Sequence, residues 1–320
     1  MATLASSTPA ERSTHKFVLG AWAVLGWNLL VILWGAFVRA SGSGAGCGGH
    51  WPLCNGQVLP QAPAAPTIIE FAHRTTSFIA LIAVFALAFA ARRLFPKGHR
   101  ARTAAALGAL FIVTEALLGA GLVLFDYVAQ NASIGRAIYL SLHLVNTQLL
   151  IATLFLTAWF ADHPDARPDR PFFPALVALP IAVAVSITGA IAALGDTLFP
   201  ASSLAAGLRQ DFSPAEALLV RLRVIHPALA IASAAFFIYA ALAALRARPG
   251  SGTQRAVWCV LALTLAQVCA GAVNIALLAP IWMQLVHLLL ADLVWMALLA
   301  LALQTGNKPS EPQVLRSRRA

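Results

Sequence analysis

Residues 68–91 read IIEFAHRTTSFIALIAVFALAFAA, and a stretch of this kind decides the fold. From Thr75 to Ala91 it contains no charged side chain, and two arginines follow at once. A helix of about 20 apolar residues spans the hydrocarbon core of a bilayer. The stretch therefore predicts a membrane-spanning helix. Three ionisable side chains fall in its first turns: Glu70, His73 and Arg74.

The remainder of the chain repeats this apolar pattern. Of its 320 residues, 60% are hydrophobic and only 11% are charged, whereas about a quarter are charged in soluble domains. This composition excludes an ordinary soluble fold and predicts an all-α integral membrane protein. Eight apolar runs are expected to form its transmembrane helices: 17–38, 68–91, 103–125, 137–160, 172–195, 215–244, 255–278 and 281–304.

The basic side chains indicate how these helices are oriented, because Lys and Arg concentrate in cytoplasmic loops. One side of the predicted bundle holds Arg12, Lys16, Arg92, Arg93, Lys97, Arg100, Arg102, Arg167, Arg170, Arg246, Arg248, Arg255, Lys308, Arg316, Arg318 and Arg319. The opposite loops hold only Arg39, Arg136 and Arg209. We therefore expect both termini in the cytoplasm and a multi-pass protein of the bacterial inner membrane. The net charge of +10 then lies on one side of that membrane and does not indicate nucleic-acid binding.

The two halves of the sequence share features at an offset near 150 residues. The matching positions are Gly35 and Gly189, His73 and His226, Gly119 and Gly271, and His143 and His287. Four helices in each half give both halves the same orientation, so we expect two pseudo-symmetric four-helix bundles. The predicted layout is a cytoplasmic tail at 1–16, a first bundle at 17–160 with an outer loop at 39–67, a linker at 161–171, a second bundle at 172–304 and a basic tail at 305–320.

Four of the eight histidines lie in the even-numbered predicted helices: His73, His143, His226 and His287. Each falls near the outer end of its helix, so all four are expected at similar depth near the periplasmic face. An ionisable group in hydrocarbon indicates a functional site. A single histidine there is equally well explained as a core residue, but two on neighbouring helices can bind a haem iron from both faces. The recurrence predicts one haem site, with two iron-binding histidines, in each half.

The halves differ in their acidic residues. Glu70 precedes His73 by three residues, and the matching position of the second half has no acid. A carboxylate beside a metal-bound substrate can take a proton or stabilise a developing cation. Pairing of Glu70 with Arg74 at the membrane interface is the alternative. Glu115 likewise corresponds to Gln267 in the second half. Because no second Glu-x-x-His unit occurs, a di-iron carboxylate bundle is disfavoured.

The outer loop contains the sequence GCGGHWPLC at residues 46–54. Its Cys47 and Cys54 have six residues between them and can close into a disulfide. Metal binding is the alternative, although these two and His50 do not complete a zinc site. The glycine-rich run at 41–49 lacks the ending of a phosphate loop. It either folds the loop back over the bundle as a lid or is a flexible linker.

Two further cysteines, Cys259 and Cys269, fall in the seventh predicted helix. They lie ten residues apart, about 15 Å along a helix axis, which is too far for a disulfide. We expect them to be buried apolar fillers.

Over essentially all eight helices the sequence resembles the haem A synthase family of membrane enzymes. The resemblance rests on GAFVR at 35–39, GSG at 42–44, the loop residues at 46–56 and EFAHR at 70–74, together with the later histidines His143, His226 and His287.

This resemblance implies oxidation of the C8 methyl group of haem O to a formyl group, which gives haem A for cytochrome oxidase. It implies a haem b cofactor held by His226 and His287, and a substrate haem site formed by His73, His143 and Glu70. It also implies that the paired loop cysteines form a redox-active or structural disulfide.

Several arginines near the outer ends of the helices could pair with haem propionates: Arg39, Arg74, Arg221 and Arg223. Ordinary snorkelling to the interface explains each of them equally well. Arg74 and Arg223 are our predicted cofactor-binding residues. The expected partners are haem O, membrane lipid, a haem O synthase (protohaem farnesyltransferase), an electron acceptor or donor, and a second copy of the chain.

Two other kinds of protein would also have eight apolar helices. A quinol-linked electron-transfer subunit with two haems b would bind haem without altering it, but it leaves the acid beside only one histidine pair unexplained. A transporter with parallel repeats leaves the four histidines unexplained.

Overall fold

The computed structural model describes residues 9–166 and 172–306, and nearly all regular structure in these ranges is helical. The long helices are α1 (Pro9–Ala40), α2 (Ala65–Leu94), α3 (Arg100–Leu124), α4 (Ile134–Asp162), α5 (Phe173–Leu198), α8 (Ile225–Ala247), α9 (Ser251–Ala276) and α10 (Ile281–Gly306). Within the described ranges, eight segments are long and apolar enough to cross a membrane. The predicted all-α, multi-pass membrane protein is confirmed.

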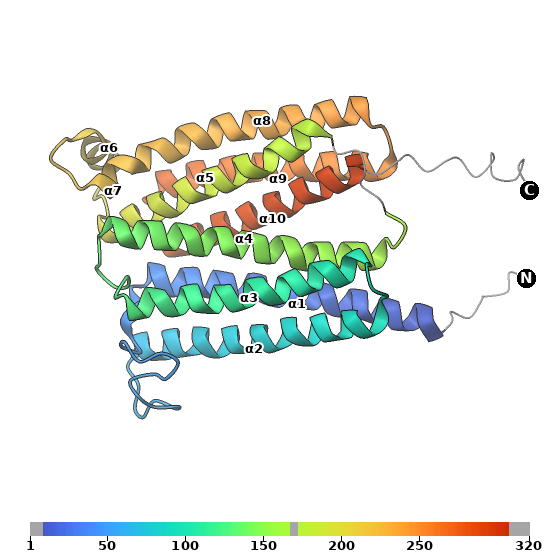
Figure 1. Ribbon diagram of the computed structural model, residues 1–320. Coiled ribbons are helices and arrows are strands. Elements are labelled where there is room, and N and C mark those ends of the chain that lie inside the picture. Colours follow the sequence, from blue (N-terminus) through green and yellow to red (C-terminus); the bar gives the residue numbers. More distant parts are fainter. Residues whose placement is uncertain (1–8, 167–171, 307–320) are drawn as a thin grey trace, which may run out of the picture.

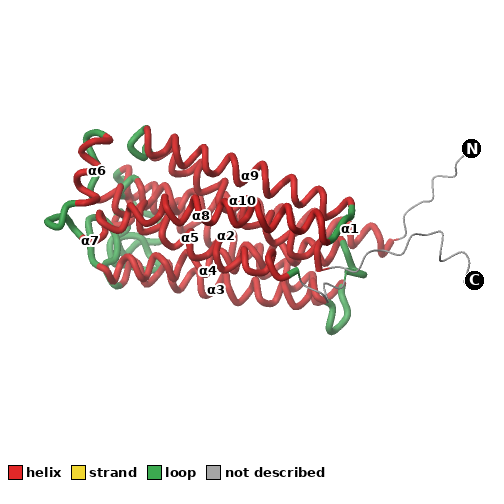
Figure 2. The backbone as a smooth tube through the Cα atoms, turned by 90° about the horizontal axis from the view of Figure 1, so that it is seen from above, coloured by secondary structure: helices red, strands yellow, loops and turns green. Residues whose placement is uncertain are grey.

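The long helices run side by side along one axis (Figures 1 and 2). Helices α1 to α4 contact one another as one group, and α5, α8, α9 and α10 form a second. Helix α4 lies in the middle, where it contacts α1 and α3 on one side and α5 and α10 on the other. Helix α1 begins and α10 ends at the same end of the bundle (Figure 1).

The apolar side chains are divided between a packed centre and an outward-facing surface. Leu150 and Leu154 of α4 and Leu298 of α10 are fully buried. The outer faces carry large apolar side chains that are more than half exposed, including Leu30, Phe89, Ile231, Trp258 and Leu265. In a membrane-spanning bundle such side chains face lipid, so their exposure follows from the solvent.

The expectation that Cys259 and Cys269 are buried is wrong, because both are exposed. Helix α9 packs against α8 and α10 and lies at the edge of the bundle. Its remaining face is therefore turned outward. Hydrophobicity does not distinguish these faces, because lipid accepts a thiol-bearing side chain as readily as a protein core does.

The predicted single helix at 215–244 is interrupted. The chain forms α7 (Leu218–Arg221), a 3-10 turn η2 (Leu222–Val224) and then α8. Pro227 explains the interruption, because a proline ring clashes with the carbonyl group four residues earlier in an α-helix. That carbonyl belongs to Arg223, within the 3-10 turn.

The start of the first helix and two of the loops also differ from the prediction. Helix α1 begins at Pro9, inside the predicted tail, because hydropathy marks only the part of a helix that crosses the hydrocarbon core. The segment between α5 and α7 contains a further helix, α6 (Leu204–Phe212), which is too short and too polar to appear as an apolar run. The outer loop at 39–67 contains the 3-10 turn η1 (Ser43–Ala45). Residues 1–8, 167–171 and 307–320, which complete the predicted tails and linker, lie outside the described residues.

Candidate functional site

The outer loop is closed by a disulfide between Cys47 and Cys54. This confirms the disulfide that the sequence allowed and that the resemblance implied. The loop also packs closely on the start of α2. The Thr67 hydroxyl donates to the carbonyl of Gly46 at 2.8 Å, and a Cβ at Gly46 would overlap the carbonyl group of Pro66. Only glycine permits this approach.

Glu70 connects this loop to α2. Its Oε2 accepts a hydrogen bond from the backbone N–H of Cys47 at 2.8 Å, and its Oε1 accepts from the Arg74 guanidinium at 2.5 Å. Arg74 in turn donates to the carbonyl oxygens of His50 and Leu53, at 3.2 and 2.8 Å. Glu70 is only 3% exposed. The loop between Cys47 and Cys54 is therefore anchored at several points. This part of the loop is not a flexible linker.

Each of the four histidines predicted to bind iron has its ring against a glycine of a neighbouring helix. Helix α1 supplies Gly35 for His73, α3 supplies Gly119 for His143, α5 supplies Gly189 for His226 and α9 supplies Gly271 for His287. A Cβ at these glycines would lie 2.8, 3.9, 2.9 and 3.1 Å from the Cε1 atoms of the respective rings. The imidazoles therefore occupy space that a larger residue would fill.

His226 and His287 are close enough to hold one metal atom between them. Their ring centroids are 6.3 Å apart, and the ring planes are nearly perpendicular. A metal stands about 2 Å from each coordinating imidazole nitrogen, which separates the two ring centroids by roughly 6 Å. This pair fits the axial ligation of a haem iron. In the first half, His143 lies within electrostatic range of His73.

Unsatisfied ring nitrogens also indicate that these sites are completed by a bound group. The Nδ1 atoms of His73, His143 and His287 are buried and have no hydrogen-bond partner, and a buried polar atom in this state is costly. The Nδ1 atom of His226 lies 3.1 Å from the Thr188 hydroxyl. Among the described residues, no three His, Cys, Asp or Glu side chains gather to hold a metal ion. Haem ligation requires only two.

A second carboxylate, Glu115 of α3, lies beside the first histidine pair. Its Oε1 is 3.5 Å from the Nδ1 atom of His143. The Thr147 hydroxyl and the Asn146 amide, which follow His143 along α4, donate to its two oxygens at 2.5 Å each. The sequence comparison of the halves indicated this position, because Glu115 corresponds to Gln267, but it did not identify Glu115 as a site residue.

Both predicted cofactor-binding arginines already have protein partners. Arg74 is held by Glu70 and the loop carbonyls. Arg223 donates to Asp211 at 2.9 Å and to Asp196 at 3.1 Å, and it is 8% exposed. Any propionate would compete with these carboxylates. Haem binding by these two arginines stays a prediction.

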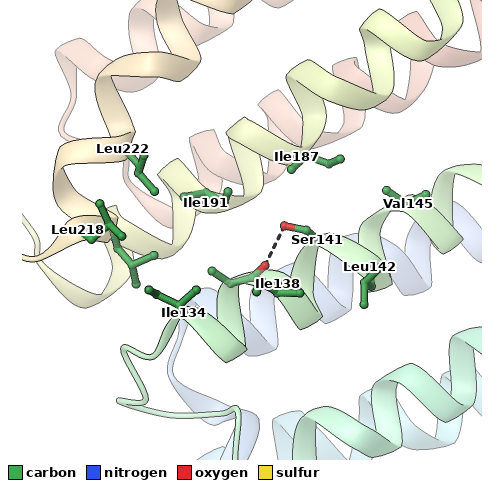
Figure 3. A pocket seen from close by; sticks show the side chains of 11 residues that line it. Ile134, Ile138, Ser141, Leu142, Val145, Ile187, Ile191, Leu218 and Leu222 are labelled. Atoms are coloured by element: carbon green, nitrogen blue, oxygen red, sulfur yellow. Dashed lines mark hydrogen bonds between the residues drawn. The ribbon is translucent and has the colours of Figure 1, made fainter.

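An apolar groove of about 340 Å³ opens between α4, α5 and α7, on the boundary of the two helix groups. Figure 3 shows the side chains that line it, among them Ile134 and Ile138 of α4 and Ile187 and Ile191 of α5. The polar atom in its lining, the Ser141 hydroxyl, donates back to the Ala137 carbonyl at 2.8 Å. The groove suits a hydrocarbon chain and offers no ligand for a metal.

The fold and site together define a class: multi-pass helical membrane proteins with a histidine pair inside each of two four-helix groups. Residues 19–299 match the COX15-CtaA family model, described as a cytochrome oxidase assembly protein. The chain belongs to this family, so the family resemblance is confirmed.

Individual relatives point the same way. The chain is 46% identical over 301 residues to a Thermus thermophilus protein named protohaem IX farnesyltransferase, a match that covers 91% of this chain and 49% of the relative. It is 38% identical over 143 residues to the haem A synthase of Halalkalibacterium halodurans, covering 45% of each chain. It is 34% identical over 146 residues to the haem A synthase of Shouchella clausii, covering 46% of each. The chain thus spans about half the length of the curated relatives it matches.

Proposed function

We propose that this chain is a haem A synthase, an oxidoreductase that converts the C8 methyl group of haem O to a formyl group. Support comes from the family match and from relatives named haem A synthase. The observation that carries the proposal is the 6.3 Å separation of the His226 and His287 rings, each lying against a glycine. In this proposal these two histidines hold haem b, and His73 and His143 bind the substrate haem.

The repeated glycine–histidine contacts also support the proposed pseudo-symmetry. In both halves the glycines lie on the first and third long helices and the histidines on the second and fourth. We propose that the two four-helix bundles are related by an axis along the membrane normal, with cytoplasmic termini and haem sites near the periplasmic face of a bacterial inner membrane.

A bound haem iron supplies the electron-transfer and oxygen chemistry that amino-acid side chains lack. The residues of this chain bind the substrate haem, orient it and enclose it. The imidazoles of His73 and His143 orient the substrate, and the surrounding apolar helices exclude water. Glu70 keeps the disulfide loop against α2 and places a carboxylate one helical turn from His73, where it can take a proton as the methyl group is oxidised.

A haem O synthase is the proposed partner. The T. thermophilus relatives carry the name protohaem IX farnesyltransferase, and this chain matches 49% of their length. Haem O is a farnesylated, lipid-soluble molecule, so transfer between two membrane proteins keeps it out of water. With water as the source of the formyl oxygen, the conversion –CH3 + H2O → –CHO + 4 H+ + 4 e− also requires an electron acceptor. We include this electron acceptor among the proposed partners. A second copy of the chain is a further proposed partner.

The first experiment identifies the bound haems. We expect the purified chain to contain haem b together with haem O or haem A by mass spectrometry. His226→Ala and His287→Ala should each abolish the low-spin bis-histidine spectrum of haem b, because one axial ligand cannot give a six-coordinate iron. Haem b alone would favour an electron carrier, and a normal haem b spectrum in both variants would refute the assignment of the second site.

The second experiment tests Glu70 as a proton acceptor. We expect Glu70→Gln to lower haem A output about 100-fold at unchanged haem b content, with haem O or its hydroxymethyl form accumulating. Arg74→Gln is the matched control, because it breaks the same ion pair and leaves the acid in place. An equal loss in both variants would assign Glu70 to loop anchoring, and wild-type output from Glu70→Gln would remove it from the chemistry.

A further inference from the structure

The surroundings of Glu115 hold its carboxylate in a defined place beside His143. The Thr114 hydroxyl donates to Oδ1 of Asn146 at 2.6 Å, and this orients the Asn146 amide so that its nitrogen faces Glu115. With Thr147 on the other oxygen, the carboxylate has two fixed donors. A carboxylate can accept about four hydrogen bonds, so it retains capacity for the Nδ1–H of His143, 3.5 Å away.

The second half has a neutral side chain at the same place. Glu115 lies four residues before Gly119, and Gln267 lies four residues before Gly271, on α3 and α9 respectively. The amide nitrogen of Gln267 is 3.4 Å from the Nε2 atom of His287. Each side chain thus stands one helical turn from the glycine that faces the histidine ring. Glu115 and Gln267 thus occupy matching positions along their helices, but Glu115 presents a carboxylate oxygen to Nδ1 of its histidine, whereas Gln267 presents an amide nitrogen to Nε2.

This difference has a chemical consequence for a metal-binding histidine. An imidazole that binds metal through one nitrogen carries a proton on the other, and the acceptor of that proton sets the orientation and basicity of the ring. A carboxylate makes the ring a stronger electron donor than a neutral amide does. In a low-dielectric bundle the negative charge also favours the more positive, oxidised iron.

We propose that Glu115 is a positioning residue that makes the two haem sites unequal. When His143 binds iron through Nε2, Glu115 accepts its Nδ1–H, whose nitrogen lies 3.5 Å from Oε1 in this structure. This contact lowers the reduction potential of the haem bound in the first half, relative to the haem bound by His226 and His287. The inference rests on the proposed function, because it requires haem at both histidine pairs. It attributes the chemical difference between the two haem sites to Glu115 and Gln267, in addition to Glu70.

The test is a redox titration of the full chain in detergent, after it has been loaded with iron protoporphyrin IX. The variant His226→Ala lacks the second site, so the signal that it retains belongs to the first site. We expect Glu115→Gln to shift the ferrous-to-ferric ratio of the first site at least tenfold toward the reduced form, about 59 mV for a one-electron couple. The second site should not move. The reciprocal change Gln267→Glu should shift the second site by a similar amount in the opposite direction.

Thr147→Val is the matched control, because it removes a donor to Glu115 and leaves the charge in place. We expect it to shift the first site much less than Glu115→Gln does. A readout without haem is available from solid-state NMR of the chain with ¹⁵N-labelled histidine. In those spectra the chemical shift of the His143 Nδ1–H group should change in Glu115→Gln and should be unchanged in Thr147→Val.

The outcomes separate the two proposals. If both haems bind and neither Glu115→Gln nor Gln267→Glu changes its site, the inference about Glu115 is overturned and the proposed function stands. If the wild-type chain takes up haem at neither histidine pair, both are overturned. Should Glu115→Gln fail to fold, Gln267→Glu decides alone, because it places a carboxylate beside the ring of His287 in the other half.

Discussion

At the scale of single residues, the recurring unit of this protein is a histidine ring lying against a glycine. At three of the four pairs a Cβ on the glycine would lie 2.8 to 3.1 Å from the ring. Side chains in a packed interior have little room to yield at such distances. The glycines are therefore required by the imidazoles, in addition to allowing close approach of the helices.

Gly35→Ala tests this requirement. The added methyl group would lie 2.8 Å from Cε1 of His73 and push the ring out of place. We expect the affinity of the first site for iron protoporphyrin IX to fall about tenfold, measured by absorbance titration. Gly26→Ala on the same helix is the control, because a Cβ there meets nothing within 4 Å. Equal affinities in the two variants would show that the glycine contact does not position the histidine.

At the scale of elements, the ends of the helices carry much of the polar chemistry outside the membrane core. Helix α6 brings Asp211 to Arg223, next to the turn imposed by Pro227. Helix α3 begins with His99 as its cap, whose Nδ1 atom accepts the N–H of Ala101 at 3.2 Å and whose ring stacks on Phe95. These contacts hold the turns between long helices.

The His99 cap should depend on pH. Burial lowers the pKa of His99 from its ordinary value of 6.5. A protonated Nδ1 cannot accept a hydrogen bond, so the cap is fully formed above pH 6.5 and is lost as the pH falls below that value through the lowered pKa. We expect the protection factors of the first amides of α3 in hydrogen exchange to fall about fivefold over this range, as for a cap worth about 1 kcal/mol.

The control for this prediction is His99→Asn, because asparagine caps a helix without titrating in this range. Its protection factors should stay constant across the same pH values. A pH dependence equal to that of the wild type would assign the effect to another group.

At the scale of the whole molecule, polar contacts join the two helix groups near the centre and at the end of the bundle that carries the disulfide loop. Arg39 of α1 donates to the Ala193 carbonyl and the Thr197 hydroxyl of α5, and to Gln284 of α10, at 2.9 to 3.0 Å. The Trp295 indole donates to the Gln148 carbonyl across the buried contact of α10 with α4. Both histidine pairs are therefore parts of one packed unit.

The orientation of this unit in the membrane can be tested with its own disulfide. In intact cells of a variant carrying Cys259→Ala and Cys269→Ala, we expect a membrane-impermeant maleimide to modify Cys47 and Cys54 only after reduction. A second variant adds Cys47→Ser, Cys54→Ser and Lys97→Cys to the same background. Its introduced cysteine should be labelled only in permeabilised cells. The reason is that position 97 lies in the loop between α2 and α3, at the opposite end of the bundle from the disulfide loop (Figure 1). The reverse pattern would place the termini outside.

The sequence by itself determined the helical, membrane-spanning fold, because runs of about 20 apolar residues have one stable solution in a bilayer. It also placed a histidine on every second long helix and allowed the Cys47–Cys54 disulfide, since both follow from position along the chain. Spacing alone paired Glu70 with Arg74, four residues apart on one helix face.

Only the tertiary structure decided which faces of the helices meet. It placed Glu115 beside His143, enclosed Arg223 with Asp196 and Asp211, and turned Cys259 toward the outside. The physical reason is that apolar helices in lipid gain nothing from hydrophobicity when they rotate about their axes. Their facing sides are set by packing of small residues and by polar contacts between distant segments, and neither can be read from a local pattern.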